Sequence, residues 1–155
     1  MSPVGLGLIA IGAIAAAAAA GRPFADRVAP GLTEDTKRAL AALLGALAAA
    51  GIRVKIGSAG RSQAAQRAAF EAGKSGTLKS LHTVGRAVDL YPIGADGLPD
   101  FAGRDVELFR RMHHIAAGLG WHGIAFNADG SRRYIETPRG SVWDGGHLEW
   151  RGAPS

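Results

Sequence analysis

Apolar side chains recur at helical spacing just after residue 32. Leucines three and four positions apart share one face of a helix, and four of them form such a stripe. The stripe consists of Leu40, Leu43, Leu44 and Leu47. Thr33 stands before it as an N-cap, with two acidic residues in the first turn, and Gly51 follows it. The pattern predicts a helix with a buried leucine face that begins at Thr33 and ends at Gly51.

A second kind of element is expected over residues 86–91, where the side chains alternate as in a strand. Because successive side chains of a strand point to opposite faces, Val88 and Leu90 are expected to face the core. Asp89 and Tyr91 then share the other face, together with Ala87. Other strands are expected over residues 52–58, 133–136 and 146–150.

Two more helices complete the expected fold, one over residues 62–72 with Ser62 as its cap, and one over residues 105–119 that Gly120 closes. Helices and strands do not alternate in a regular manner along the chain. The pattern therefore favours an α+β fold with a small, mainly antiparallel sheet and flanking helices.

The first 21 residues differ from the rest because they carry no charge, and residues 4–20 form an apolar run at the short limit for a membrane span. No Lys or Arg precedes this run, as one would in a secretory signal, and Arg22 and Arg27 follow it. A weak membrane anchor, an assembly helix, a signal and a flexible alanine-rich tail all stay open. The chain divides into an apolar N-terminal segment (1–21), a linker with two prolines (22–32) and one domain (33–155).

Composition narrows the classes of chemistry. The chain of 155 residues is long enough for one domain with a real core, and it contains no cysteine, which excludes disulfides and thiolate metal ligands. The net charge of +5 favours anionic partners. No basic and aromatic pattern typical of nucleic-acid binding is present, so we attribute this charge to solubility and to attraction to anionic polymers, and expect no nucleic-acid partner.

Two histidines and an aspartate are candidates for a metal site. Imidazole nitrogens and a carboxylate are the ligands of catalytic zinc, which keeps a further position for water. Gly85 permits a tight bend that brings His82 back over Asp89, and His147 would complete the set. Asp144 lies three residues before His147 and could take a proton from the bound water. These residues predict a zinc hydrolase.

Two further residues are candidates for the chemistry. Glu149 shares a strand face with His147 and is either a rival base or a carboxylate that orients His147 by accepting its other ring N–H. Arg61 follows the strand expected over residues 52–58, where a guanidinium could stabilise an oxyanion. Three other histidines are expected to be surface or hydrogen-bonded residues: His113, His114 and His122.

The motif Ser-x-His-x-x-Gly-x-Ala-x-Asp-Leu, followed by Asp-x-x-His-x-Glu, resembles the zinc peptidases that cut peptidoglycan stem peptides. That family includes D-Ala-D-Ala carboxypeptidases and the L-alanyl-D-glutamate endopeptidases of bacteriophage endolysins. The resemblance covers residues 33–150 and implies a hedgehog/DD-peptidase-like fold. It implies zinc ligands at His82, Asp89 and His147, and a catalytic base at Asp144. It also implies that Arg61 lies near the scissile carbonyl and that Gln66 and Ser80 line the substrate cleft.

The resulting hypothesis is a zinc peptidase that hydrolyses stem peptides, as a phage endolysin or virion-associated lysin. Such an enzyme would act at the cell wall, with membrane or phage-particle association through residues 4–20. One alternative is a non-catalytic metal-binding module, as in the related hedgehog domain, although Asp144 and Arg61 argue against it. A structural component of a phage particle is the other alternative. Which stem-peptide bond is cut stays open.

Overall fold

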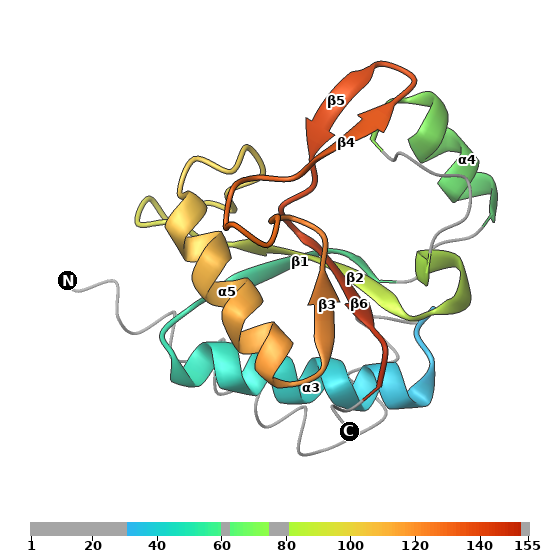
Figure 1. Cartoon of the computed structure of the whole chain (residues 1–155). Helices are drawn as coiled ribbons and strands as arrows, with labels where there is room; N and C mark the ends of the chain where they lie inside the picture. The colour runs from blue at the N-terminus through green and yellow to red at the C-terminus, as the bar shows by residue number, and fades with distance from the viewer. Residues whose placement is uncertain (1–30, 60–62, 75–80, 153–155) are drawn as a thin grey trace.

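The computed structural model of the chain describes residues 31–59, 63–74 and 81–152 (Figure 1). The apolar N-terminal segment and the proposed cleft residues Arg61 and Ser80 lie outside these residues, as does the helix cap expected at Ser62. Among the helices of the described residues, none is both long enough and apolar enough to cross a membrane.

The described residues form an α+β fold, as the sequence pattern predicted. Its helical elements are α3 (Glu34–Ala49), α4 (Gln63–Glu71), the 3₁₀ turn η1 (Leu81–Val84) and α5 (Val106–Gly118). Its strands are β1 (Val54–Ala59), β2 (Ala87–Pro92), β3 (Trp121–Gly123), β4 (Tyr134–Thr137), β5 (Gly140–Trp143) and β6 (His147–Trp150).

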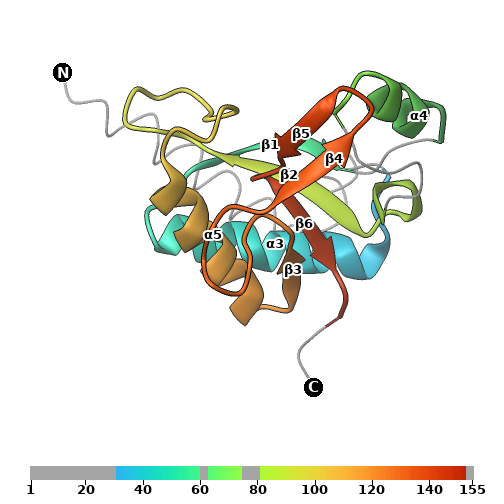
Figure 2. The same cartoon turned by 45° about the horizontal axis from the view of Figure 1, so that its top comes forward.

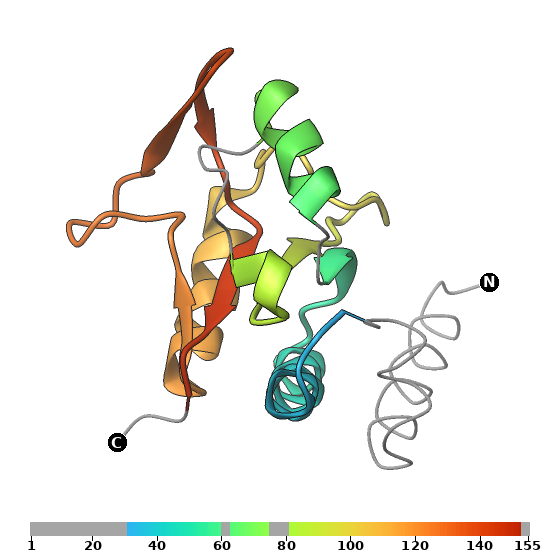
Figure 3. The same cartoon turned by 90° about the vertical axis from the view of Figure 1, so that its right-hand side faces the viewer.

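Four strands form one antiparallel sheet in the order β1-β2-β6-β3, and β4 and β5 form a separate hairpin. The last strand, β6, is therefore inserted between β2 and β3. Helix α3 lies on one side of the sheet, whereas α4 and the β4–β5 hairpin lie on the other (Figures 1 and 3). The turned view in Figure 2 shows the hairpin beside α4. One face of the sheet thus packs on α3, and the opposite face is turned toward the hairpin and α4.

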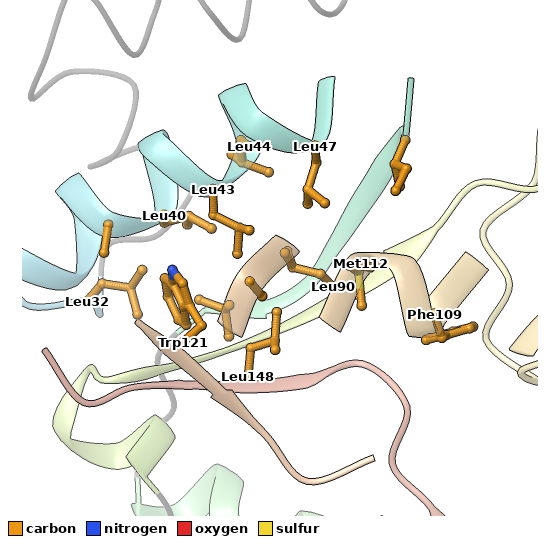
Figure 4. Packing of buried hydrophobic residues seen from close by; sticks show 14 residues of the cluster. Leu32, Leu40, Leu43, Leu44, Leu47, Leu90, Phe109, Met112, Trp121 and Leu148 are labelled. Atoms are coloured by element: carbon orange, nitrogen blue, oxygen red, sulfur yellow. The ribbon is translucent and has the colours of Figure 1, made fainter. Parts of the chain in front are cut away.

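The core lies between α3, α5 and the sheet (Figure 4). All four leucines of the predicted stripe are buried, with Leu43 and Leu47 fully inaccessible. They meet inward-facing side chains of the strands and of α5, among them Leu90, Leu148, Met112 and Trp121. Burying one such side chain contributes on the order of 1.5–3 kcal/mol, so this face of the sheet holds the fold together. Val88 and Leu90 of β2 belong to this core, as predicted, although Ala87 and Asp89 between and beside them are buried as well.

The start of α3 is tied to the turn between His82 and Asp89. Thr33 occupies the predicted N-cap position, but its hydroxyl makes no cap hydrogen bond and instead contacts Asp35 and Thr36. Its backbone N–H donates to the carbonyl of Gly85 at 3.0 Å. Gly85 has a φ of +72°, and a Cβ there would lie 2.4 Å from the carbonyl oxygen of Gly31. Glycine is thus required both for the bend and for the close approach.

Two short strands were not anticipated from the sequence. Strands β3 and β5 lie at the two ends of the polar stretch between Trp121 and Trp143. They have three and four residues, which is too few to show a clear alternation of apolar and polar side chains. Strand β1 also has an irregular register between Ile56 and Ser58. A Cβ at the intervening Gly57 would lie 2.5 Å from the ring of Tyr91. The absence of a side chain at Gly57 therefore leaves room for the aromatic ring of Tyr91.

Candidate metal centre

Three side chains converge on the face of the sheet opposite α3. His82 comes from η1, Asp89 from β2 and His147 from β6, and Asp89 and His147 are paired directly across the two strands. The Nε2 atom of His82 lies 3.1 Å from Oδ1 of Asp89 and 3.2 Å from Nδ1 of His147. The same Asp89 oxygen lies 3.4 Å from Nδ1 of His147. All three side chains are buried.

These distances fit a divalent metal ion. Bonds of 2.0–2.1 Å at tetrahedral angles place neighbouring ligand atoms roughly 3.3–3.4 Å apart, close to the three separations observed. A single ring nitrogen carries at most one proton, yet Nε2 of His82 faces two potential ligand atoms at once. Two nitrogens and one oxygen that point at a common centre are better satisfied by a cation than by hydrogen bonds alone. Within the described residues, this is the group that could hold a metal ion.

The surroundings of His147 favour positive charge. Burial alone would lower its pKa, but hydrogen bonds to Asp89 and Glu149 and the charges of Asp144 and Asp89 raise the pKa to about 10. For Asp89, burial alone would raise the pKa, but the hydrogen bonds and charges of His147 and His82 bring it well below its ordinary value. The site is therefore a buried region of negative potential, which attracts a cation.

Glu149 lies behind His147 rather than in the ligand triangle. Its Oε1 is 3.2 Å from Nε2 of His147, the ring nitrogen that faces away from Asp89. Its Oε2 accepts hydrogen bonds from Arg151, at 2.7 Å from Nη2 and 3.1 Å from Nε. The hydrogen bond from His147 and the contact with Arg151, against a smaller opposing effect of burial, lower the pKa of Glu149 to about 2. This is the contact expected of a carboxylate that orients His147.

Asp144 stands close to the three candidate ligands without belonging to their cluster. Its side chain is half-buried, and its charge contributes to the raised pKa of His147. Residues 144–146 form the loop that carries Asp144, and a side chain of α5 contacts this loop. The Nε2 atom of His113 lies 2.7 Å from the carbonyl oxygen of Gly145 and can donate a hydrogen bond to it. Burial and the charge of His147 lower the pKa of His113, against the opposing effect of the hydrogen bond to Gly145, which favours the neutral ring.

The remaining predicted cleft residues are placed less completely. Gln66 is fully buried on α4, which lies on the side of the sheet opposite α3. The residues on either side of Gln66 are exposed, so its burial is unusual for a glutamine, a residue that is mostly found at the surface. Arg61 and Ser80 lie outside the described residues.

Three residues near the site were not assigned to it from the sequence: His113, Arg151 and Tyr91. The helical phase could have found His113, because it lies one turn from the buried Phe109, whereas His114 is exposed. The ring of Tyr91 lies where side chains at Gly57 and Gly146 would stand and packs edge-on against Phe101. Strand alternation after His147 could have indicated Arg151.

The chain resembles known proteins in its structure. No protein family model and no curated protein matches the chain. Two solved structures are similar over most of their length. One is the L-Ala D-Glu endopeptidase ChiX of Serratia marcescens, with 20% identity, a TM-score of 0.58, and coverage of 81% of this chain and 85% of that one.

The other is a mutant of the vancomycin resistance D,D-pentapeptidase VanY from a VanB-type cassette, in complex with Zn(II). It is 18% identical, with a TM-score of 0.54 and coverage of 78% of this chain and 73% of that one. Both are peptidases of the kinds that the sequence motifs resemble, and one of them holds zinc. At these identities the likeness establishes a shared architecture: the chain has the fold of the zinc peptidases that its motifs resemble.

Proposed function

We propose that the protein is a zinc-dependent peptidase that hydrolyses peptide bonds in peptidoglycan stem peptides. One observation carries the proposal: His82, Asp89 and His147 present two nitrogens and one oxygen at the spacing of metal ligands. They do so in a fold shared with an L-Ala D-Glu endopeptidase and with a zinc-bound D,D-pentapeptidase. The motif that resembles this class of enzyme supplies all three residues.

The proposed roles follow from the chemistry of each side chain. His82, Asp89 and His147 hold the ion, which when bound supplies a Lewis acid and lowers the pKa of its water. Asp144 accepts the proton of that water. Arg61 stabilises the negative charge that develops on the scissile carbonyl oxygen. Gln66 and Ser80 line the substrate cleft.

The contacts of Glu149 support Asp144 as the base. Both carboxylate oxygens of Glu149 are engaged, one by His147 and the other by Arg151. A base must reach the proton that it removes, and Glu149 lies on the far side of the imidazole from the other ligands. Asp144 carries its charge close to His147 and is not one of the three ligands.

The setting in which the enzyme works is part of the same proposal. A stem-peptide substrate places its action at the cell wall, and residues 33–155 form the catalytic domain. Residues 4–20 then serve placement, at a membrane or in a phage particle, for an enzyme of the endolysin or virion-associated lysin type. Its basic charge favours attraction to anionic wall polymers.

Digestion of purified cell walls tests the proposal. The intact protein should release new amino groups from peptidoglycan, lose this activity with a chelator and regain it when zinc is added back. Mass spectrometry of the fragments identifies which bond is cut. Asp144→Asn provides the matched control, since it keeps the size of the side chain and removes the base. Zinc-bound protein that adheres to walls without releasing amino groups would instead indicate a non-catalytic binding module.

A further inference from the structure

We propose that Arg151 is a positioning residue of the metal centre, which acts through Glu149 to hold His147 with Nδ1 toward the ion. The inference rests on the proposed function, because it concerns the same metal. It gives a role to a solvent-exposed arginine, whose substitution would be expected to have no effect if exposure alone were considered.

The contacts form a chain that leads outward from the ligands. Nδ1 of His147 faces Asp89 and His82, and Nε2 of the same ring faces Oε1 of Glu149 at 3.2 Å. The guanidinium of Arg151 then places two N–H groups on the other oxygen, Oε2. The two carboxylate oxygens thus have different partners, since Oε1 accepts from the imidazole and Oε2 accepts from the arginine.

The chain of contacts decides which ring nitrogen of His147 has a lone pair for the metal ion. An imidazole that donates its Nε2 proton to a carboxylate keeps the lone pair on Nδ1, and this is the form that binds a metal ion. Without a fixed acceptor, the ring could take the other tautomer or rotate. Glu149 is a flexible side chain, and Arg151 removes its freedom by holding the oxygen that the histidine does not use.

The backbone explains why these three residues meet. Positions 147, 149 and 151 alternate along one face of an extended segment, so their side chains point the same way. Strand pairing extends to the end of β6, since the N–H of Trp150 donates to the carbonyl of Arg86 at 2.8 Å. The burial decreases outward along this row, from the buried His147 through Glu149 to Arg151, whose side chain is 58% exposed.

Exposure makes a purely structural role distinguishable from a positioning role. Exposed ion pairs contribute little to the free energy of unfolding. Removal of Arg151 should therefore leave the metal-free protein as stable as before, and should weaken metal binding. A structural role predicts the opposite pattern, a lower unfolding temperature in the metal-free state with an unchanged zinc affinity.

The experiment measures the zinc dissociation constant of the full chain by competition with a chromophoric chelator. The variants are Arg151→Ala, Arg151→Lys, Glu149→Gln and the double variant with Arg151→Ala and Glu149→Gln. Arg104→Ala is the matched control, because Arg104 is also an exposed arginine that lies beside carboxylates, Asp96 and Asp100. The absorption spectrum of the cobalt-substituted protein reports the ligand geometry independently of activity.

Loss of the carboxylate should weaken zinc binding roughly 10- to 100-fold. Arg151→Ala should weaken it by a smaller factor, on the order of 3- to 10-fold, and change the cobalt spectrum, with Arg151→Lys between it and the wild type. Because Arg151 acts through Glu149, the double variant should bind zinc about as well as Glu149→Gln alone. Arg104→Ala should match the wild type.

Two results would overturn the inference: a zinc affinity of Arg151→Ala equal to that of the wild type, or effects of the two substitutions that multiply in the double variant. If the wild type binds zinc and cleaves stem peptides in either case, the proposed function stands and the role of Arg151 alone falls. A wild-type protein that binds no zinc would overturn both.

Discussion

Asp89 and His147 stand directly opposite each other on the antiparallel strands β2 and β6, with Oδ1 of the aspartate 3.4 Å from Nδ1 of the histidine. The sheet itself therefore sets the separation of two of the three proposed ligands. Their strand neighbours Val88 and Leu148 are also paired and point into the core. Core packing on one face thus holds the register that brings the ligands together on the other.

The first prediction concerns the metal. The purified protein should contain one zinc ion per chain, and His147→Ala should lose it, because the two remaining ligands cannot hold the ion tightly. Elemental analysis of both proteins measures this. Since an ion that binds only the folded state stabilises it, the wild type should also melt at a lower temperature after chelation. Wild-type protein without stoichiometric metal would contradict the proposed centre.

The second prediction concerns the base. Asp144→Ala should retain zinc and lose turnover by about 10²–10⁴, the usual contribution of general-base catalysis. Rates on purified walls and metal content are the two measurements. Glu149→Gln should have a larger effect on zinc affinity than on the rate at saturating zinc. If instead Glu149→Gln lost the rate and Asp144→Ala kept it, the assignment of the base should be reversed.

The third prediction concerns His113, which donates to the carbonyl of Gly145 in the loop that carries Asp144. His113→Phe should leave this carbonyl without its partner, destabilise the fold by about 1–3 kcal/mol and slow turnover while zinc is retained. Urea unfolding and wall digestion measure the two effects. The neighbouring His114→Ala is the control, since His114 is exposed. Equal behaviour of the two variants would show that the contact does not position the loop.

The fourth prediction concerns a core substitution that should lower stability without changing zinc binding. Leu43 is fully buried on α3, on the side of the sheet away from the proposed ligands. Leu43→Ala should lower the free energy of unfolding by about 2–5 kcal/mol, because it leaves a cavity in packed surroundings. Folded protein should still bind zinc with wild-type affinity. A loss of zinc affinity in the folded variant would show that α3 packing controls the ligand geometry.

The fifth prediction concerns the N-terminal segment. Deletion of residues 1–27 removes none of the proposed ligands, bases or cleft residues and leaves Thr33 and α3 intact. The shortened protein should fold, bind zinc and digest isolated wall fragments at about the wild-type rate. Its placement should change, which fractionation of membranes and of assembled particles would detect. An insoluble or zinc-free product would mean that this segment is part of the domain core.

The sequence by itself determined the elements that depend on neighbouring residues. The leucine stripe of α3, the alternation of β2 and the Gly85 turn are local patterns, because the period of a helix or strand repeats within a few residues. The proposed ligands followed from their residue types and from the resemblance of their motifs. Strands β3 and β5 were not predicted because they are too short to show a period.

Only the tertiary structure decided what lies beside what. The insertion of β6 between β2 and β3 brings His147 to Asp89 across a long stretch of sequence. The same pairing turns Nδ1 of His147 toward Asp89 and His82, whereas the row of His147, Glu149 and Arg151 along one face follows from strand alternation. Contact between His113 and the Gly145 carbonyl likewise depends on how α5 packs. Such relations arise from packing between distant segments, and no local period encodes them.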